Sequence, residues 1–334
     1  MAKNIPRQLL AAWNGALASL MVFTNDNSSS GDLRAGLRAQ RLLGVLARLV
    51  FNVPARKLGA EVKFEGLQSQ NKALSARLDY LRSGNIARLF QICAAHSRSL
   101  SDAVGHDDVD SEMVRQMAPD ALADRFCALA SIGEYSRAIR LLGSTGIAPI
   151  NESTMGALRS LIKETPIDER ERLLKAAQPF HVGRSPIPLT ASILRKALRR
   201  LPRLAAAALS GWRNDYLRSL ADLPKSALRS LLPFFNSFLL HEFAEFDQIA
   251  RMVRLVPFIK VPSGIRPVGV PDPFHKLKGQ LWLVLLRSSI KRVVSPFQFG
   301  VLMKAGIEAL SRSLLDENAQ FPMLIKKKDA KNFF

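Results

Sequence analysis

The clearest β-structure signal in the chain is Leu255-Val256-Pro257-Phe258-Ile259-Lys260-Val261-Pro262-Ser263-Gly264-Ile265-Arg266-Pro267-Val268-Gly269-Val270. Its two apolar runs flank a Pro-Ser-Gly turn, a pattern that predicts a hairpin of two short strands. Lys260 precedes the turn and Arg266 follows it. Because arginine forks onto phosphate oxygens and lysine supplies a point charge, such a hairpin is suited to folding over a triphosphate. Surface hairpins often carry basic residues, so this pair alone also fits an ordinary solvated turn.

Helical patterns surround the hairpin on both sides. Upstream, apolar periodicity predicts helices over Ala191 to Leu198, Leu217 to Leu220, Ala227 to Phe238 with a break at Pro233, and Phe243 to Val253. Downstream, helices are expected from Leu281 to Val294 and from Ile307 to Leu315. The segment Val182 to Pro188 contains two prolines and a glycine and predicts an extended linker, which is the preferred domain boundary.

The amino-terminal half is also predicted to be helical. An amphipathic helix is expected over Leu37 to Leu49 and should end by Pro54. Two later segments each predict a helix, a glycine turn at Gly84 or Gly133, and a second helix, since glycine readily takes the left-handed backbone that ends a helix. Only two such units occur, which favours helical hairpins within a larger domain over a repeat array. The acidic run His106 to Asp110 is expected to cap a helix, where carboxylates favour the first turn.

The first residues of the chain superficially resemble a signal peptide. Lys3 and Arg7 precede the apolar stretch Leu9 to Phe23, but Asn14 interrupts that stretch. The following residues, 24 to 32, are rich in Asn, Ser and Asp and predict a linker without a convincing cleavage site. We therefore expect an amphipathic or buried helix here, an intracellular protein that is not secreted, and no membrane-spanning segment.

The charge balance predicts a polyanionic partner. The 334 residues include 48 Lys and Arg against 28 Asp and Glu, a formal net charge of +20, and the hydrophobic share of 48% is ample for sizeable cores. Nucleic acid is the first candidate partner and an anionic membrane surface the second. Any single basic cluster also fits a solvated helix face. The two cysteines, Cys93 and Cys127, cannot form a zinc cluster. A disulfide between them is an open alternative that no cysteine framework supports, and a reducing compartment fits them best.

The order of motifs along the second half resembles reverse transcriptases of the non-LTR retrotransposon type. The hairpin with Arg266-Pro267 is followed by the Lys276 helix, a Gln298-Phe299-Gly300 turn and the terminal Asp329-Ala330-Lys331-Asn332-Phe333-Phe334. Gly211-Trp212 also resembles the Ser-Gly-Trp segment that opens the polymerase region of these elements. The resemblance spans residues 35 to 334 and is strongest over 205 to 334.

The resemblance implies a role for each matching residue. Asp329 would be the first metal-binding carboxylate, and Phe334 the steric gate that excludes a ribose 2′-OH. Arg266 and Lys260 would contact the incoming triphosphate. The remaining implied residues, Gln298, Phe299 and Gly300, would shape the floor under the template base. RNA, DNA and deoxynucleoside triphosphates are the implied partners, and Mg²⁺ is the implied cofactor.

The resemblance also implies a domain organisation and a mainly α fold with a small β element. We expect an N-terminal helix and linker over 1–32 and an Arg-rich helical domain over 33–181. A linker over 182–204 would lead to a partial reverse transcriptase domain, the fingers and the first palm strand, over 205–334. The fold implied for that last part is an incomplete right-hand polymerase.

Enzymatic activity is left open by the sequence, and we expect this chain to be inactive. Asp329 alone cannot hold two Mg²⁺ ions, because metal catalysis of this kind needs oxygens from separate strands and no second Asp cluster follows it. One alternative is a non-catalytic, basic helical protein that binds nucleic acid through its phosphates. A second alternative is a helical-repeat scaffold for protein partners. The sequence does not predict an oligomeric state.

Overall fold

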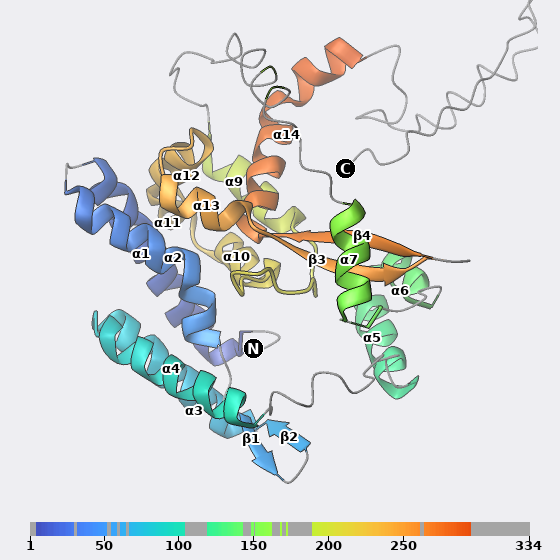
Figure 1. Ribbon diagram of the computed structural model, residues 1–334. Coiled ribbons are helices and arrows are strands. Elements are labelled where there is room, and N and C mark those ends of the chain that lie inside the picture. Colours follow the sequence, from blue (N-terminus) through green and yellow to red (C-terminus); the bar gives the residue numbers. More distant parts are fainter. Residues whose placement is uncertain are drawn as a thin grey trace, which may run out of the picture. The chain divides into compact units, whose positions relative to one another are not determined.

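The structure, a computed structural model, describes residues 5–29, 32–51, 55–58, 61–64, 67–103, 119–142, 148–149, 151–161, 168, 172, 189–260 and 264–294. The chain divides into two compact units, Met1–Gln280 and Leu281–Phe334. The described part is mainly helical and has two small antiparallel hairpins, as Figure 1 shows. The prediction of a mainly α fold with a small β element is confirmed.

The amino-terminal helices belong to the core of the first unit. A short 3-10 helix, η1 (Arg7–Leu9), leads into α1 (Leu10–Ser29), and α2 (Leu33–Phe51) packs against α1. Trp13, Leu17 and Met21 recur every four residues along α1 and are fully buried, which explains why this apolar stretch forms a buried helix. The Trp13 indole N–H donates to the carbonyl of Tyr216 at 3.1 Å, and Asn14 donates to that of Ser219 at 3.0 Å.

Two helical hairpins follow, and both end their first helix at a glycine. They are formed by α3 (Leu67–Arg82) with α4 (Ile86–Ala103) and by α5 (Pro119–Ser131) with α6 (Tyr135–Leu142). Gly84 has a φ of 73° and Gly133 a φ of 78°. Asn85 N–H donates to the Tyr80 carbonyl at 2.9 Å, and Glu134 N–H donates to the Leu129 carbonyl at 3.0 Å. Both predicted helix–glycine–helix turns are therefore confirmed and share one capping geometry.

Short helices build an aromatic core next to the Ser210-Gly211-Trp212 turn. They are α9 (Ala191–Arg200), α10 (Asn214–Arg218), η4 (Ser219–Asp222), α11 (Lys225–Ser230), α12 (Leu232–Leu239) and α13 (Ala244–Arg251). Trp212 is fully buried, packs edge-on against Phe274 at 4.9 Å between ring centroids, and donates its indole N–H to the Leu43 carbonyl. The turn therefore joins α2 to the start of α14 (Pro273–Val294). The predicted break in the Ala227 to Phe238 helix is confirmed at Leu231, just before Pro233.

Each sheet is a single antiparallel hairpin. β3 (Val253–Ile259) pairs with β4 (Ile265–Pro271) in the region where the sequence predicts a hairpin. β1 (Ala55–Leu58) pairs with β2 (Glu61–Phe64), and the sequence analysis did not predict this second hairpin. A further helix, α7 (Glu152–Leu161), lies against β4.

The linkers differ from the sequence-based expectation. α1 continues through Ser29, so residues 24–29 of the predicted linker are helical. Within this helix, the side chains of Thr24 and Asn27 donate to the carbonyls of Leu20 and Phe23, four residues earlier. α9 confirms the helix predicted over Ala191 to Leu198, and it lies within the segment 182–204 that is predicted as a linker.

Two further expectations are tested by the described residues. Cys93 and Cys127 are both free thiols, and burial raises the pKa of Cys93. Among the described helices, none has the length and apolar character needed to cross a membrane.

Candidate nucleic-acid interface

Prolines fix the register of the β3–β4 hairpin. Pro257 lies opposite Pro267, and neither residue has a backbone N–H to donate. This pair must therefore occupy a position without cross-strand hydrogen bonds. Because hydrogen-bonded and non-hydrogen-bonded pairs alternate along an antiparallel ladder, the neighbouring pairs, including Phe258 opposite Arg266, are the hydrogen-bonded ones. The ladder continues toward the turn, where Lys260 N–H donates to the Gly264 carbonyl at 3.0 Å.

This register divides the hairpin into two chemically different faces. Directly paired residues share a face, and successive residues on a strand alternate between faces. Arg254, Phe258, Lys260 and Arg266 therefore lie on one face, together with Val256, Val268 and Val270. We call it the cationic face of the hairpin, because all of its charged side chains are basic. The opposite face carries apolar residues, among them Val253, Leu255, Ile259, Ile265 and Pro267.

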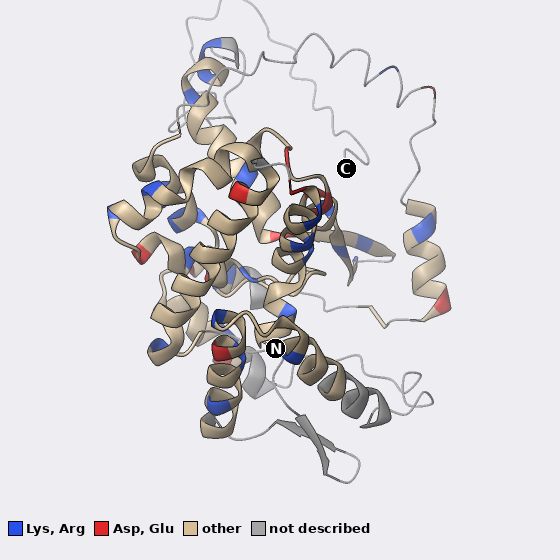
Figure 2. Cartoon of the chain, turned by 90° about the vertical axis from the view of Figure 1, so that its left-hand side faces the viewer, with Lys and Arg blue, Asp and Glu red and all other residues tan. Residues whose placement is uncertain are grey.

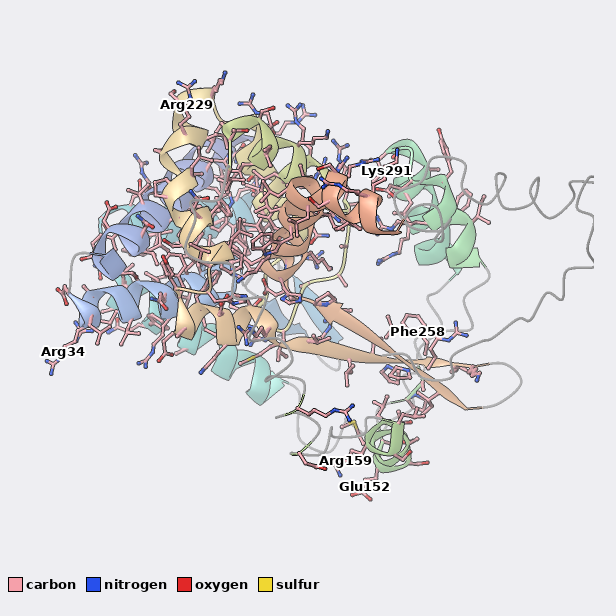
Figure 3. The ribbon with its side chains drawn as sticks, turned by 90° about the horizontal axis from the view of Figure 1, so that it is seen from above. Arg34, Glu152, Arg159, Arg229, Phe258 and Lys291 are labelled. Carbon is pink, nitrogen blue, oxygen red and sulfur yellow. The ribbon has the colours of Figure 1, made fainter. Side chains whose placement is uncertain are left out.

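The cationic face has the chemistry of a nucleic-acid contact. Lys260 and Arg266 are exposed, Phe258 is half-buried, and no Asp or Glu occurs from Val253 to Pro271. A phosphate would meet two cations on strands that carry no acidic residue, and an aromatic ring beside a guanidinium can stack on a base. Figure 3 shows the hairpin from above, with Phe258 labelled on its distal half.

The hairpin is held at its side by α7 and the residues before it. The Ala148 N–H donates to the carbonyl of Pro257 at 2.8 Å, and α7 contacts β4. Asn151 begins α7 by accepting a hydrogen bond from Thr154 N–H at 2.9 Å, and Leu158 is buried. Because a two-stranded hairpin is marginal alone, this support helps to fix the cationic face.

At its base, the hairpin leads directly into a capped helix. Asp272 is 1% exposed, caps α14 by accepting from Phe274 N–H at 2.9 Å, and accepts a second hydrogen bond from the Ser210 hydroxyl. Burial raises the pKa of Asp272 to about 6, despite these two donors. The Ser-Gly-Trp turn, the end of β4 and the start of α14 therefore meet at one carboxylate.

A second charged cluster ties α14 to the helices before the hairpin. The Lys278 ammonium lies 3.4 Å from an oxygen of Asp247 and 4.5 Å from the centre of the Phe238 ring. His241 Nδ1 lies 2.6 Å from the other oxygen of Asp247 and 3.0 Å from both Lys278 Nζ and Arg251 Nη2. Burial lowers the pKa of Lys278 to about 8, with Asp247 opposing the shift. His241 takes a left-handed backbone with a φ of 62°.

A third cationic group lies at the first turn of α14. Lys276 is half-buried, and burial lowers its pKa, with Arg137 of α6 adding to the shift and Asp272 opposing it. Arg137 itself donates to the carbonyl of Arg203 at 2.7 Å and lies 3.7 Å from Glu134. Positive side chains from α6 and α14 thus approach one another beside the hairpin base.

The structure locates only part of the predicted site. Arg266 and Lys260 are described, and they lie on the same face of the hairpin. Asp329, Phe334, Gln298, Phe299 and Gly300 lie outside the described residues, as do His106 to Asp110. No cluster of His, Cys, Asp or Glu suited to a metal ion occurs within the described ranges. The implied role of Asp329 as the first carboxylate of an incomplete Mg²⁺ site therefore remains a prediction, and so does the expectation that this chain does not bind Mg²⁺ stably.

Sequence reasoning missed two features of this site. Arg254 and Phe258 were not identified as site residues, although strand alternation places both with Lys260. The Asp247, His241 and Lys278 cluster was also missed, because its members lie on three different elements and have no sequence spacing to reveal them. Comparison of the chain with protein-family models, curated proteins and solved structures found no match.

Proposed function

We propose that this chain binds nucleic acid through its phosphates and that the cationic face of the β3–β4 hairpin is a contact surface. The observation that carries the proposal is the placement of Lys260 and Arg266, both exposed and on one face, with no acidic residue on either strand. The whole-chain charge of +20 supports it, since net positive charge attracts a polyanion over long range. In Figure 2, Lys and Arg are spread over the helices with fewer Asp and Glu among them.

We further propose that the chain derives from a reverse transcriptase of the retroelement type. Its support is the order of the Ser210-Gly211-Trp212 turn, the hairpin with Arg266 and the helix with Lys276, together with the sequence beyond them. In that setting the hairpin would contact either a nucleic-acid backbone or the phosphates of an incoming nucleotide with Mg²⁺. The two ligands share phosphate chemistry, so an experiment must separate them.

A binding experiment with a matched control tests the proposal. Fluorescence anisotropy would report binding of a labelled single-stranded RNA and of an RNA–DNA hybrid to the full chain. The variant Lys260→Glu/Arg266→Glu reverses two charges on the cationic face. The control Arg34→Glu/Arg229→Glu makes the same change in net charge at exposed positions on α2 and α11, both labelled in Figure 3.

The expected result is a loss of affinity of about tenfold or more for the hairpin variant and a smaller loss for the control, because only the hairpin variant loses phosphate contacts. The magnitude of the salt slope should also fall by about 0.7–0.9 for each lost contact. Competition by a deoxynucleoside triphosphate with Mg²⁺ would assign the contact to the nucleotide. Lack of competition would assign it to the backbone. Equal affinity of the hairpin variant and its control would overturn the proposal.

A protein-binding scaffold is the second candidate function. Tyr135 and Ile139 lie one helical turn apart on α6, and each is 65% exposed, while Phe90 of α4 is 47% exposed. Exposed apolar side chains at related positions of two similar helical hairpins favour a protein partner. Salt separates the candidates, since an apolar contact depends on it far less than a phosphate contact does.

A further inference from the structure

α9 is a short helix whose apolar side packs against the rest of the protein. Its N-cap, Thr190, accepts a hydrogen bond from Ile193 N–H at 3.3 Å. Leu194 and Leu198 are fully buried, and the helix packs on η4 and α11. The remaining side of the helix carries Arg195, Lys196, Arg199 and Arg200, which is the expected consequence of amphipathic periodicity.

These four basic residues line a shallow, open depression along α9. The depression has a volume of about 340 Å³ and is open to solvent; its described lining is Ser192 and the four basic side chains, and this described lining contains no carboxylate. Within the described residues, no ion pair involves any of the four. Their charge is therefore not neutralised by a described carboxylate within ion-pair distance.

The basic side chains of α9 are not needed to cap the carboxyl end of their own helix. The last carbonyls of α9 need donors, and arginines near a helix end often supply them. Here Arg218 of α10 does so, since its guanidinium donates to the carbonyl of Arg199 and, at 2.7 Å, to that of Leu201. Arg195 is held in place by donating to the Leu223 carbonyl at 2.7 Å. Its Nε is buried without a hydrogen-bond partner among the described residues.

We propose that this side of α9 is a second phosphate-binding site, one that binds the backbone of the same nucleic acid as the hairpin. The inference rests on the proposed function and extends it from a hairpin contact to a two-site contact. Three of the four cations are arginines, whose planar forks match phosphate oxygens. Helical spacing places Lys196, Arg199 and Arg200 on neighbouring positions of one side, so they can contact a continuous run of phosphates.

The chemistry of α9 favours nucleic acid over a membrane surface. A helix that lies on a membrane inserts an apolar face into the lipid. The apolar side of α9 is buried in the protein, and its leucines are unavailable for insertion. A membrane would therefore find only basic side chains on α9 and no apolar face to insert. A nucleic-acid backbone can bind through the basic side chains alone.

The test removes three charges from α9 and leaves Arg195 in place because it supports the fold. The variant Lys196→Gln/Arg199→Gln/Arg200→Gln keeps good helix formers at all three positions. The matched control, Arg34→Gln/Arg38→Gln/Arg229→Gln, removes three exposed charges elsewhere. Circular dichroism would first establish that both variants retain the helical content of the wild type.

Affinity for a labelled single-stranded RNA would then be measured between about 50 and 200 mM salt. We expect the α9 variant to lose affinity about tenfold or more and the slope of log K against log salt to fall in magnitude by about 2, at about 0.7 per phosphate contact. The control should change both quantities much less. Two other ligands are tested separately for binding to the wild type, namely vesicles that contain anionic lipid and an acidic peptide in solution. Each should bind the wild type less tightly than the RNA does.

The outcomes separate this inference from the proposed function. If the α9 variant and its control bind RNA equally while the hairpin variant fails, the α9 site is wrong and the hairpin contact stands. If the hairpin variant binds as its own control does while the α9 variant fails, the hairpin contact is wrong and α9 alone carries the binding. Tighter binding of the wild type to anionic vesicles or to the acidic peptide than to RNA overturns the inference.

Discussion

At the scale of single residues, the most consequential group is the buried carboxylate of Asp272. It receives hydrogen bonds from the Ser210 hydroxyl and from Phe274 N–H, and these fix the start of α14 relative to the Ser-Gly-Trp turn. Burial nevertheless outweighs these donors and raises the pKa of Asp272 to about 6. The folded protein therefore binds this proton more tightly than the unfolded chain does.

The sign of the resulting pH dependence follows from linkage. The unfolded pKa is near the usual 3.8, so the stabilisation by protonated Asp272 is fully present below that pH and is lost as the pH rises through about 6. The variant Asp272→Asn keeps an acceptor for Phe274 N–H but does not titrate. Its free energy of unfolding should lose a pH dependence on the order of 2 kcal/mol between pH 4 and 7.

Urea denaturation across that pH range measures the effect of Asp272→Asn. The exposed carboxylate of Asp222, changed to Asn, is the control and should leave the profile of the wild type unchanged. If Asp272→Asn and the wild type show parallel profiles, the carboxylate does not titrate in this range and the account of its burial is wrong.

Lys278 gives a second prediction at this scale, with the opposite charge. Burial lowers its pKa from 10.5 to about 8, so the unfolded chain binds this proton more tightly above that pH. Stability from this group should therefore rise between about pH 8 and 10. Replacement by Met, which keeps the length of the stem, should remove that rise in thermal melts. An unchanged rise in Lys278→Met would contradict the assignment.

At the scale of elements, much of the fold follows from local signals and the site does not. The β3–β4 hairpin was predicted correctly because its turn chemistry and apolar alternation are local. α14 begins at Pro273, eight residues before the predicted Leu281, because its first turns are polar. Its cap, Asp272, accepts locally from Phe274 N–H, but its second donor, Ser210, is 62 residues away and could not be inferred from the sequence. β1 and β2 were missed because strands of four residues give little periodicity.

The glycine turns provide a matched pair of substitutions. Gly133 has a positive φ, and no heavy atom lies within 4 Å of the position that a Cβ would take. Gly133→Ala should therefore destabilise the protein through backbone strain alone, by about 1 kcal/mol or more. Gly15 lies inside α1 with equally open surroundings, so Gly15→Ala should stabilise by about 0.5–1 kcal/mol.

Denaturant titration of the two alanine variants compares them directly. The structure predicts midpoints that move in opposite directions from that of the wild type. Destabilisation by Gly15→Ala, or stabilisation by Gly133→Ala, would show that the turn or the helix is placed incorrectly.

At the scale of the whole molecule, the first unit is joined by contacts between its beginning and its later helices. Trp13 is fully buried, and its ring centroid lies 4.7 Å from that of Phe51. Its indole N–H donates to the carbonyl of Tyr216, 203 residues later in the chain. Such long-range contacts could not be inferred from sequence, although the apolar spacing of α1 did predict a buried helix. The first helix is thus part of the core that supports α9, α10 and the hairpin base.

Truncation of Trp13 tests this organisation. Trp13→Ala should cost about 3–5 kcal/mol, because it leaves a cavity and removes one hydrogen bond from the Tyr216 carbonyl, which also accepts from the Ser219 hydroxyl. Hydrogen exchange should accelerate in α10 and η4 as well as in α1. Phe23→Ala, on the same helix but 51% exposed, is the control and should change stability much less. Faster exchange confined to α1 would contradict the predicted coupling.

The central claim is that this chain binds nucleic acid through phosphates, and its most direct test is the salt dependence of binding by the unmodified chain. Two cations on the hairpin and three on α9 predict that log K for a single-stranded RNA falls with log salt with a slope of about −3.5, at about 0.7 per contact. A slope near zero, or no measurable binding at about 50 mM salt, would contradict the account.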